Sequence, residues 1–160
     1  MHFKTRFGEI EVPENKIITF EEGIPGFENL RRFVIVSQNT DPIMWLVSLE
    51  DENVALPIMN PWIVRVDYDV VIPESVMKSL KIEKKEDVQI WAVVSIPEGK
   101  PENMTINLLA PIVVNTKENL GAQIILEGSE YQLRHSVKEE MERSRKILEE
   151  SKEREVQGVK

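Results

Sequence analysis

Few side chains in this sequence of 160 residues are suited to catalysis. It contains two histidines, His2 and His135, and no cysteine. Histidine is the commonest general base, and cysteine supplies thiol nucleophiles and zinc ligands. The two histidines are far apart in the sequence, and neither belongs to a metal-binding spacing such as His-Glu-x-x-His. We therefore expect surface or packing roles for both histidines, no catalytic residue, no metal site and no cofactor.

Asp67 and Asp69 are the best candidates for carboxylate chemistry. On a β-strand their side chains would share one face about 6–7 Å apart, a separation that glycosidases and hard-cation sites use. The simpler interpretation is a solvated strand face with Tyr68 turned into the core, because no third ligand or partner acid stands nearby. A carboxylate-dependent hydrolase is thus the least favoured function. The acidic run at residues 50–52 lacks the alternating ligands and central glycine of a calcium loop, which indicates a loop tip.

The segment 23–27, Gly-Ile-Pro-Gly-Phe, has two glycines whose backbone N–H groups could approach a phosphate. Two glutamates precede the segment and would repel an anion, and Pro25 has no N–H to donate. Pro-Gly is instead the preferred central pair of a type II turn, in which Gly26 supplies the positive φ. We predict a rigid turn and, as the functional alternative, a rigid turn that also presents Ile24 and Phe27 to a partner.

The composition favours a protein partner over a nucleic acid. The formal net charge is −8 and the pI is about 4.9, whereas nucleic-acid-binding domains usually carry clustered positive charge. An acidic surface is better suited to attracting a basic protein. No stretch approaches the roughly 20 apolar residues of a membrane span, and the amino terminus lacks the apolar run of a signal peptide. We expect a soluble cytoplasmic protein that does not contact a membrane or bind nucleic acid directly.

Short β-rich runs separated by turn residues dominate the sequence between residues 16 and 126. Such spacing is typical of an antiparallel sandwich or small barrel, and no long helices alternate with the runs as in a parallel α/β sheet. We predict an all-β, mainly antiparallel, barrel-like or sandwich domain over residues 1–137. The expected strands are Lys16–Phe20, Phe33–Ser37, Met44–Leu49, Val54–Ile58, Ile63–Tyr68, Val88–Ile96, Met104–Val114 and Gln123–Leu126.

A hairpin and two helices complete the predicted elements. Gly8 and Glu9 fit a two-residue hairpin loop that places Phe7 opposite Ile10. A short internal helix is predicted over residues 74–80, with a proline at its start. Residues 138–160 form a predicted charged helix with several glutamate-first (i, i+4) ion pairs. Its apolar residues are few, so we expect it to dock only near its start and to project or fray beyond.

Several segments, taken in order, make the sequence similar to a known family, that of the bacterial flagellar assembly factor FliW. The resemblance covers roughly residues 1–137. One departure is Val47, where a polar residue, typically glutamine, is expected, and the charged tail is longer than the family needs. The segments that carry the resemblance are ITFEEGIPGFENLRRFVIV, WLVSLED, NVALPIMNPW, VDYDVVIP and MTINLLAPIVVNTKENLGAQIIL.

The resemblance implies a small antiparallel β structure and a non-enzymatic, partner-switching protein. Such proteins bind flagellin in the cytoplasm. They also bind the RNA-binding translational repressor CsrA and relieve its block on flagellin translation. An exposed apolar patch on a β scaffold could hold an amphipathic segment of flagellin, whereas Trp45 and Trp91 are expected in the core. The residues proposed to contact a partner are Ile24, Pro25, Phe27, Glu50, Asp51, Asn60 and Trp62.

A small-molecule-binding β-barrel is the alternative function, with the mouth of the barrel or the Asp67 and Asp69 face as its site. The two functions differ in the interior that they require. A deep apolar cavity with convergent polar groups would favour the ligand-binding barrel. A filled core with exposed apolar turns would favour a protein-docking surface.

Overall fold

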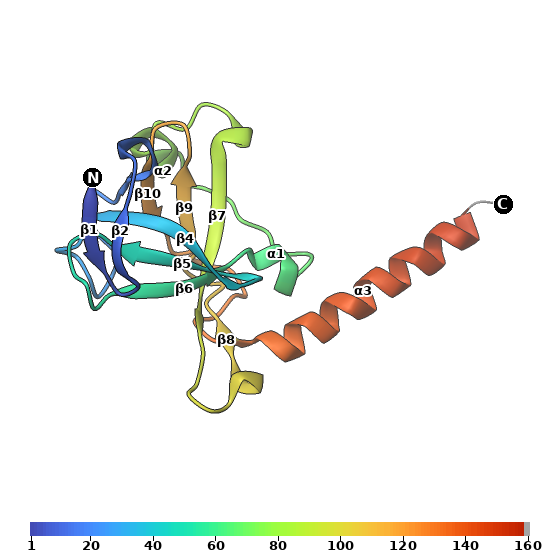
Figure 1. Cartoon of the computed structure of the whole chain (residues 1–160). Coiled ribbons are helices and arrows are strands. Elements are labelled where there is room, and N and C mark those ends of the chain that lie inside the picture. The colour runs from blue at the N-terminus through green and yellow to red at the C-terminus, as the bar shows by residue number, and fades with distance from the viewer. Residues whose placement is uncertain (159–160) are drawn as a thin grey trace.

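One nine-stranded sheet closes on itself in the computed structural model, which describes residues 1–158 (Figure 1). A separate two-stranded hairpin, two short helices and a long C-terminal helix surround it. The elements are β1 (His2–Thr5), β2 (Gly8–Glu11), β3 (Ile18–Thr19), β4 (Arg32–Thr40), β5 (Ile43–Ser48), β6 (Ala55–Met59), α1 (Pro61–Val64), α2 (Glu74–Ser79), β7 (Val88–Ser95), β8 (Thr105–Ile106), β9 (Ile112–Asn115), β10 (Leu120–Gln123), β11 (His135–Ser136) and α3 (Val137–Gly158), with single 3-10 turns at Glu14–Lys16, Lys85–Asp87 and Pro101–Asn103.

The barrel closes through β7, which pairs with different neighbours along its length. Residues 88–91 pair with β9, residues 92–93 with β6, and residues 94–95 with β8. The ring of strands therefore runs β7, β6, β5, β4, β3, β10, β9 and back to β7. All of its pairings are antiparallel except that between β10 and β3. The predicted all-β, mainly antiparallel, barrel-like fold is confirmed.

Large side chains fill the barrel interior. Phe20, Phe33 and Leu46 are completely buried, and the two phenylalanine rings meet edge to face with centroids 5.3 Å apart. Ile112 is also completely buried in this cluster. At Gly121, a Cβ atom would lie only 2.6 Å from the Phe20 ring, so the close packing requires a glycine there. This filled interior favours a protein-docking surface over a ligand-binding barrel.

The hairpin β1–β2 covers the outer face of β4 and β5. Phe3 and Ile10 pack there on a cluster that includes the paired residues Val34 and Val47. The hairpin itself was expected, but the predicted register was wrong. Phe3, not a residue of the turn, lies opposite Ile10, and the chain reverses at residues 6 and 7. The reason is that Gly8, with φ +91°, follows the two turn residues instead of starting the loop.

Three predicted strands differ from the observed elements. Residues 63–68 form part of α1 and a turn, because Asn60 and Pro61 start a helix there. Residues 104–114 are divided into β8 and β9 by a turn in which the Ala110 N–H donates to the Asn107 side-chain oxygen at 3.0 Å. The strand expected at residues 123–126 is replaced by β10 (Leu120–Gln123), since its pairing with β9 begins directly after the turn at residues 116–119.

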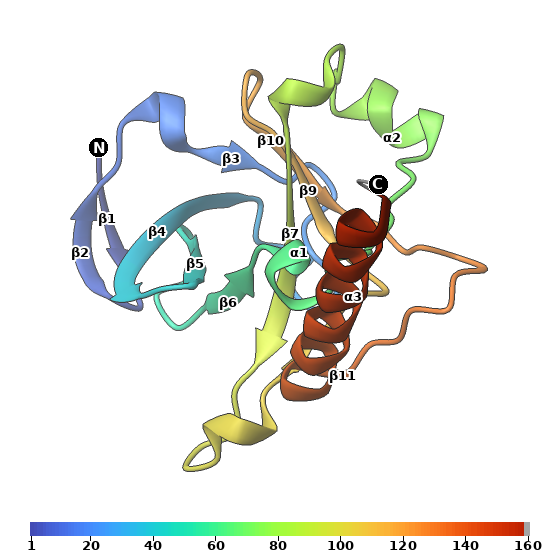
Figure 2. The same cartoon turned by 90° about the vertical axis from the view of Figure 1, so that its right-hand side faces the viewer.

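The long helix α3 docks through its first turns and then leaves the barrel (Figure 1, Figure 2). Val137 is 5% exposed, and the Ser144 hydroxyl donates to the Val64 carbonyl at 2.9 Å and accepts from the Val66 N–H at 3.0 Å. Residues 148–153 are all exposed. The predicted docking near the start of the helix is confirmed. Within residues 1–158 no helix combines the length and the apolar character that crossing a membrane would require.

Candidate functional site

The turn at residues 23–27 is rigid and only partly exposed. The Phe27 N–H donates to the Ile24 carbonyl at 2.6 Å, and Gly26 has φ +91°, as a Pro-Gly turn requires. Ile24 is 2% exposed, because its side chain packs in the barrel core. The expectation that the turn presents Ile24 to a partner is therefore wrong. Pro25 is exposed and Phe27 is half-buried, so these two residues stay candidates.

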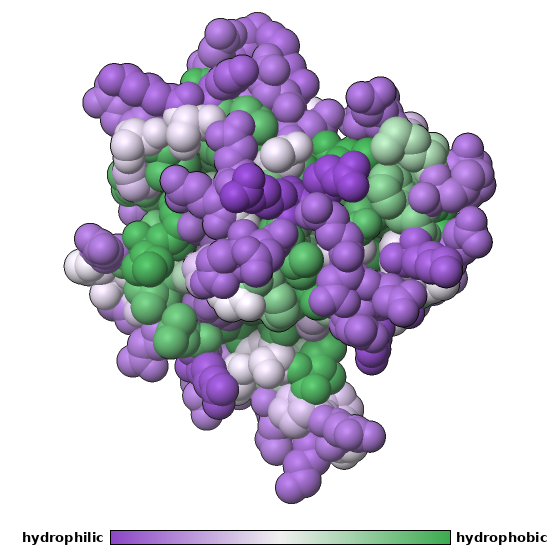
Figure 3. Space-filling model, turned by 90° about the vertical axis from the view of Figure 1, so that its left-hand side faces the viewer, coloured by the Kyte–Doolittle hydropathy of each residue, from purple (hydrophilic) through white to green (hydrophobic). Residues whose placement is uncertain are grey.

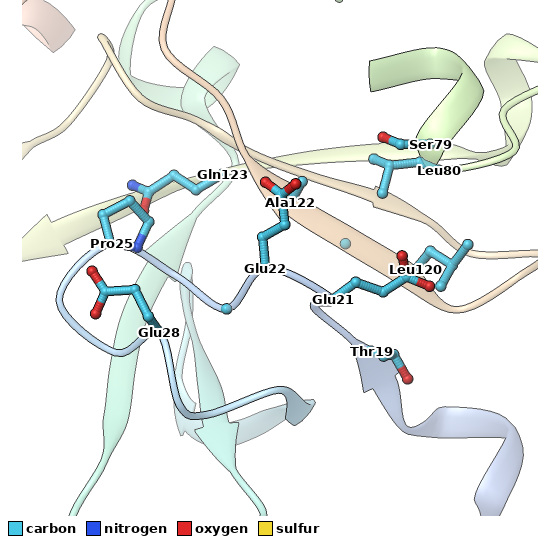
Figure 4. A pocket seen from close by; sticks show the side chains of 12 residues that line it. Thr19, Glu21, Glu22, Pro25, Glu28, Ser79, Leu80, Leu120, Ala122 and Gln123 are labelled. Carbon is cyan, nitrogen blue, oxygen red and sulfur yellow. The ribbon is translucent and has the colours of Figure 1, made fainter. Parts of the chain in front are cut away.

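An acidic pocket of about 200 Å³ lies between this turn, β10 and the end of α2 (Figure 4). Glu21, Glu22 and Glu28 line it. A hydrogen bond from the Gly26 N–H, 3.1 Å long, lowers the pKa of the Glu28 carboxyl and favours its charged form. Gly23 has φ +68°, and a Cβ atom there would lie 2.6 Å from the Glu28 backbone. The two glycines thus serve backbone geometry, and the carboxylates around them would repel an anion.

Glu50 connects the loop after β5 to the segment after the turn. Its carboxylate accepts the N–H groups of Arg31 at 2.6 Å and Arg32 at 2.9 Å. The pKa of this carboxyl lies below its ordinary value: burial, the largest effect, opposes ionisation, but the two hydrogen bonds and the two arginine charges together outweigh it. Asp51 accepts the Asn53 N–H at 2.9 Å. Both acidic candidates therefore stabilise local backbone, and their contact with a partner stays a prediction.

Asn60 and Trp62 belong to a second region, built on α1. The Asn60 side-chain oxygen accepts the Trp62 N–H at 2.9 Å and caps the helix, while Pro61 occupies its first position. Trp62 is 38% exposed, and its indole N–H donates to the Tyr68 carbonyl at 2.8 Å. The sequence Asn-Pro-Trp therefore fixes a partly exposed indole in one orientation.

The Trp62 ring begins a row of aromatic side chains. Its centroid lies 5.5 Å from that of Tyr68, which in turn lies 4.8 Å from that of Tyr131. Tyr68 is 4% exposed, as predicted for a residue turned into the core. Burial raises the pKa of its hydroxyl above the ordinary range, so it remains protonated and donates to the Leu108 carbonyl at 2.6 Å. The row anchors α1 and the loop after β10 to the core.

Arg65, which sequence reasoning missed, lies beneath this row and is 6% exposed. Its guanidinium contacts the carboxylates of Glu130 at 2.6 Å, Asp67 at 3.6 Å and Glu140 at 3.8 Å. The same group lies 4.8 Å from the centroid of the Tyr131 ring. A buried charge is tolerated when it is paired in this way. Arg65 thus connects α1, the loop after β10 and the start of α3.

Asp67 and Asp69, the candidates for carboxylate chemistry, have separate partners. Asp67 accepts two hydrogen bonds of 2.7 Å from Arg143 of α3, and these lower the pKa of its carboxyl to about 2. Asp69 instead offers its backbone N–H to the Tyr131 hydroxyl at 2.8 Å. Residues 67–69 are not a strand, so the shared strand face expected for a hydrolase or cation site is not formed. Among the side chains that the structure describes, no group of three acidic or histidine residues is placed to hold a metal ion.

The histidines and the other tryptophans have packing or surface positions. His135 is half-buried and contacts the Glu140 carboxylate at 3.1 Å, while His2 lies on the exposed hairpin. Trp45 and Trp91, expected in the core, are partly buried against core clusters. Figure 3 shows the face of the molecule that carries the hairpin β1–β2, where hydrophilic side chains predominate and hydrophobic ones form small separate areas.

Comparisons with known proteins give a consistent result. The model of the family described as FliW protein matches residues 2–137. The chain is 54% identical over 140 residues to the flagellar assembly factor FliW of Thermosipho africanus (strain TCF52B), over 87% of the chain and 97% of that relative. It is 50% identical over 149 residues to that of Thermotoga maritima, over 92% of the chain and 100% of the relative. A crystal structure of the flagellar assembly factor FliW is similar at a TM-score of 0.81 and 29% identity, covering 86% of this chain and 96% of that one.

Proposed function

The chain belongs to the FliW family of flagellar assembly factors, and from this premise we propose that it binds flagellin in the cytoplasm. It also binds the RNA-binding translational repressor CsrA. When flagellin is exported, the freed protein sequesters the repressor and relieves the block on flagellin translation. The family membership is the observation that carries the proposal. The protein acts as a chaperone and translational regulator through binding, without a catalytic step or a cofactor.

The filled barrel supports a role for the outer surface in this function. Trp62 is the best-placed anchor for a partner, since exposed aromatic residues that are already held in one orientation lose little entropy on binding. Pro25 and Phe27 form a second candidate contact on the rigid turn.

The charge of the protein supports the repressor as a second partner. With a formal net charge of −8 it can attract a basic protein over a distance, and an RNA-binding protein needs positive charge for its phosphate contacts. The same net charge argues against direct binding of nucleic acid by this chain. Translation is therefore regulated through the repressor.

Isothermal titration calorimetry of the full chain tests the proposal directly. The chain is titrated with flagellin and, separately, with the repressor, and we expect saturable binding to each. No heat of binding to either protein at tens of micromolar would overturn the assignment.

A pair of variants tests the Trp62 contact. Trp62→Ala should weaken binding of at least one partner by about tenfold or more, as for an aromatic anchor. Ile96→Ala, which changes a side chain of similar exposure (40%), is the matched control and should bind like the wild type. Thermal unfolding of both variants checks that the barrel is intact. Equal affinities of the two variants for both partners would exclude Trp62 as a contact.

A further inference from the structure

A groove of about 500 Å³ lies between the segment 69–73, which links α1 to α2, and the loop 125–131, which follows β10. Figure 2 shows this loop passing beside α3. Val71, 74% exposed, and Ile125, 57% exposed, both line the groove. Exposed aliphatic side chains gathered in a concavity are typical of an interaction site, and the volume is in the range of ligand and peptide pockets.

The segment 69–73 shows the alternating burial that is typical of an extended strand. Its burial alternates: Val70 and Ile72 pack against the core, and the residues between and beside them line the groove. The Asp69 N–H donates to the Tyr131 hydroxyl at the groove. In an extended chain the N–H two residues further on points the same way, so we expect the backbone of Val71 to face the groove as well. Among the described residues, no backbone–backbone hydrogen bond involves its N–H or its carbonyl.

The walls of the groove are acidic. Asp69, Glu127 and Glu130 line it, and none of the described lining residues is basic. The Glu130 carboxylate is paired with Arg65 at 2.6 Å. In the described part of the chain the carboxylates of Asp69 and Glu127 take part in no ion pair, which leaves them available to a cationic partner.

We propose that this groove binds an extended segment of a partner protein in which apolar residues alternate with lysine or arginine. The segment adds as a strand along Val71, places apolar side chains against Val71 and Ile125, and directs its cations at Asp69 and Glu127. An extended segment fits better than a helix, whose backbone N–H groups are already used internally. The inference depends on the groove residues alone and does not require flagellin or the repressor to be the partner.

The test uses the full chain, labelled with ¹⁵N, and a capped heptapeptide of alternating lysine and valine. We expect saturable amide shifts at Val71, Ile125 and Glu127, and slower hydrogen exchange of the Val71 N–H. A matched peptide with glutamate in place of lysine should bind about tenfold more weakly, since like charges meet at the walls. An absence of shifts at these residues, or equal binding of the two peptides, would overturn the proposal.

Strand addition and location are tested by two further comparisons. N-methylation of the central valine removes a donor from the peptide and should abolish most of the binding, whereas unchanged affinity would contradict pairing with Val71. Val71→Lys should weaken binding of the lysine–valine peptide about tenfold, and the control Ile96→Lys should leave this binding unchanged. Equal binding by the two variants would place the site elsewhere. A failure of these peptide tests while flagellin still binds by calorimetry would remove the groove and leave the proposed function in place.

Discussion

The ion pair between Asp67 and Arg143 joins α3 to the turn that follows α1. The hydrogen bonds from Arg143 are the largest cause of the low Asp67 pKa, and partial burial of the carboxyl acts in the opposite direction. The pKa falls from an ordinary value of 3.8 to about 2 on folding. A depressed pKa in the folded state means that the pair stabilises the protein above the ordinary pKa and loses this effect as the pH falls toward 2.

Asp67→Asn should therefore lower the free energy of unfolding at pH 7 by about 1 kcal/mol or less, because both partners are more than 40% exposed to water. The difference between variant and wild type should shrink as the pH falls from about 4 to about 2. Urea denaturation of the variant and the wild type at several pH values measures this difference in the free energy of unfolding. Asp69→Asn is the control, since among the described residues only its backbone is hydrogen-bonded, and it should change the free energy of unfolding at pH 7 less than Asp67→Asn does. A constant difference for Asp67→Asn would contradict the ion pair.

The candidate contacts differ in how far the sequence could predict them. The position of Trp62 beside a proline turn predicts an accessible side chain, and Trp62 is partly exposed. For Ile24 the turn pattern leaves open whether the side chain packs inward or meets a partner, because such a pattern does not show which way a side chain packs, and the structure buries it. Arg65 could not be found from the sequence, since its contact with Glu130 joins residues 65 apart and the sequence gives no period or motif for such a pair.

Among the elements, the helices α2 and α3 and most of the strands follow from local patterns, whereas the pairing of the strands does not. The helix α3 follows from its glutamate-first ion pairs, and the short helix after Pro73 from the proline at its start. Residues 63–68 have β-forming side chains, but the cap at Asn60 and the contacts of Arg65 stabilise a helical turn instead. The closure of the barrel through β7 is a tertiary pairing that strand spacing alone could not show.

The charged C-terminal tail is expected to contribute to the stability of the protein only near its start. We propose that residues 138–160 form an appendage to a family domain at residues 1–137, and that only the first turns of α3 contribute to its stability. Deleting the residues after Ile147 should leave the melting temperature nearly unchanged, because residues 148–153 are exposed and bury little apolar surface.

A longer deletion provides the comparison for this experiment. Removing the residues after Glu140 eliminates Arg143 and Ser144, which bond to the segment around α1, and should lower the melting temperature by several degrees. Calorimetric unfolding of both truncations measures the effects. A large loss of stability in the shorter deletion would show that the distal helix is docked.

At the scale of the whole molecule, net charge should control the rate at which the chain associates with the repressor. Raising the ionic strength from about 0.05 to about 0.5 M shortens the Debye length from roughly 14 to roughly 4 Å. The association rate of the chain with the repressor, measured by stopped-flow fluorescence, should then fall by about tenfold or more if acidic residues steer the encounter. A rate that does not change with salt would contradict steering by the acidic surface.

Partner switching is the central claim, and competition calorimetry tests it most directly. A complex of the chain with the repressor is formed first and is then titrated with flagellin. We predict that flagellin displaces the repressor. The apparent affinity of the chain for flagellin then falls in proportion to the concentration of repressor, and the repressor is recovered free. A stable assembly of all three proteins, with unchanged affinity for flagellin, would contradict the switch.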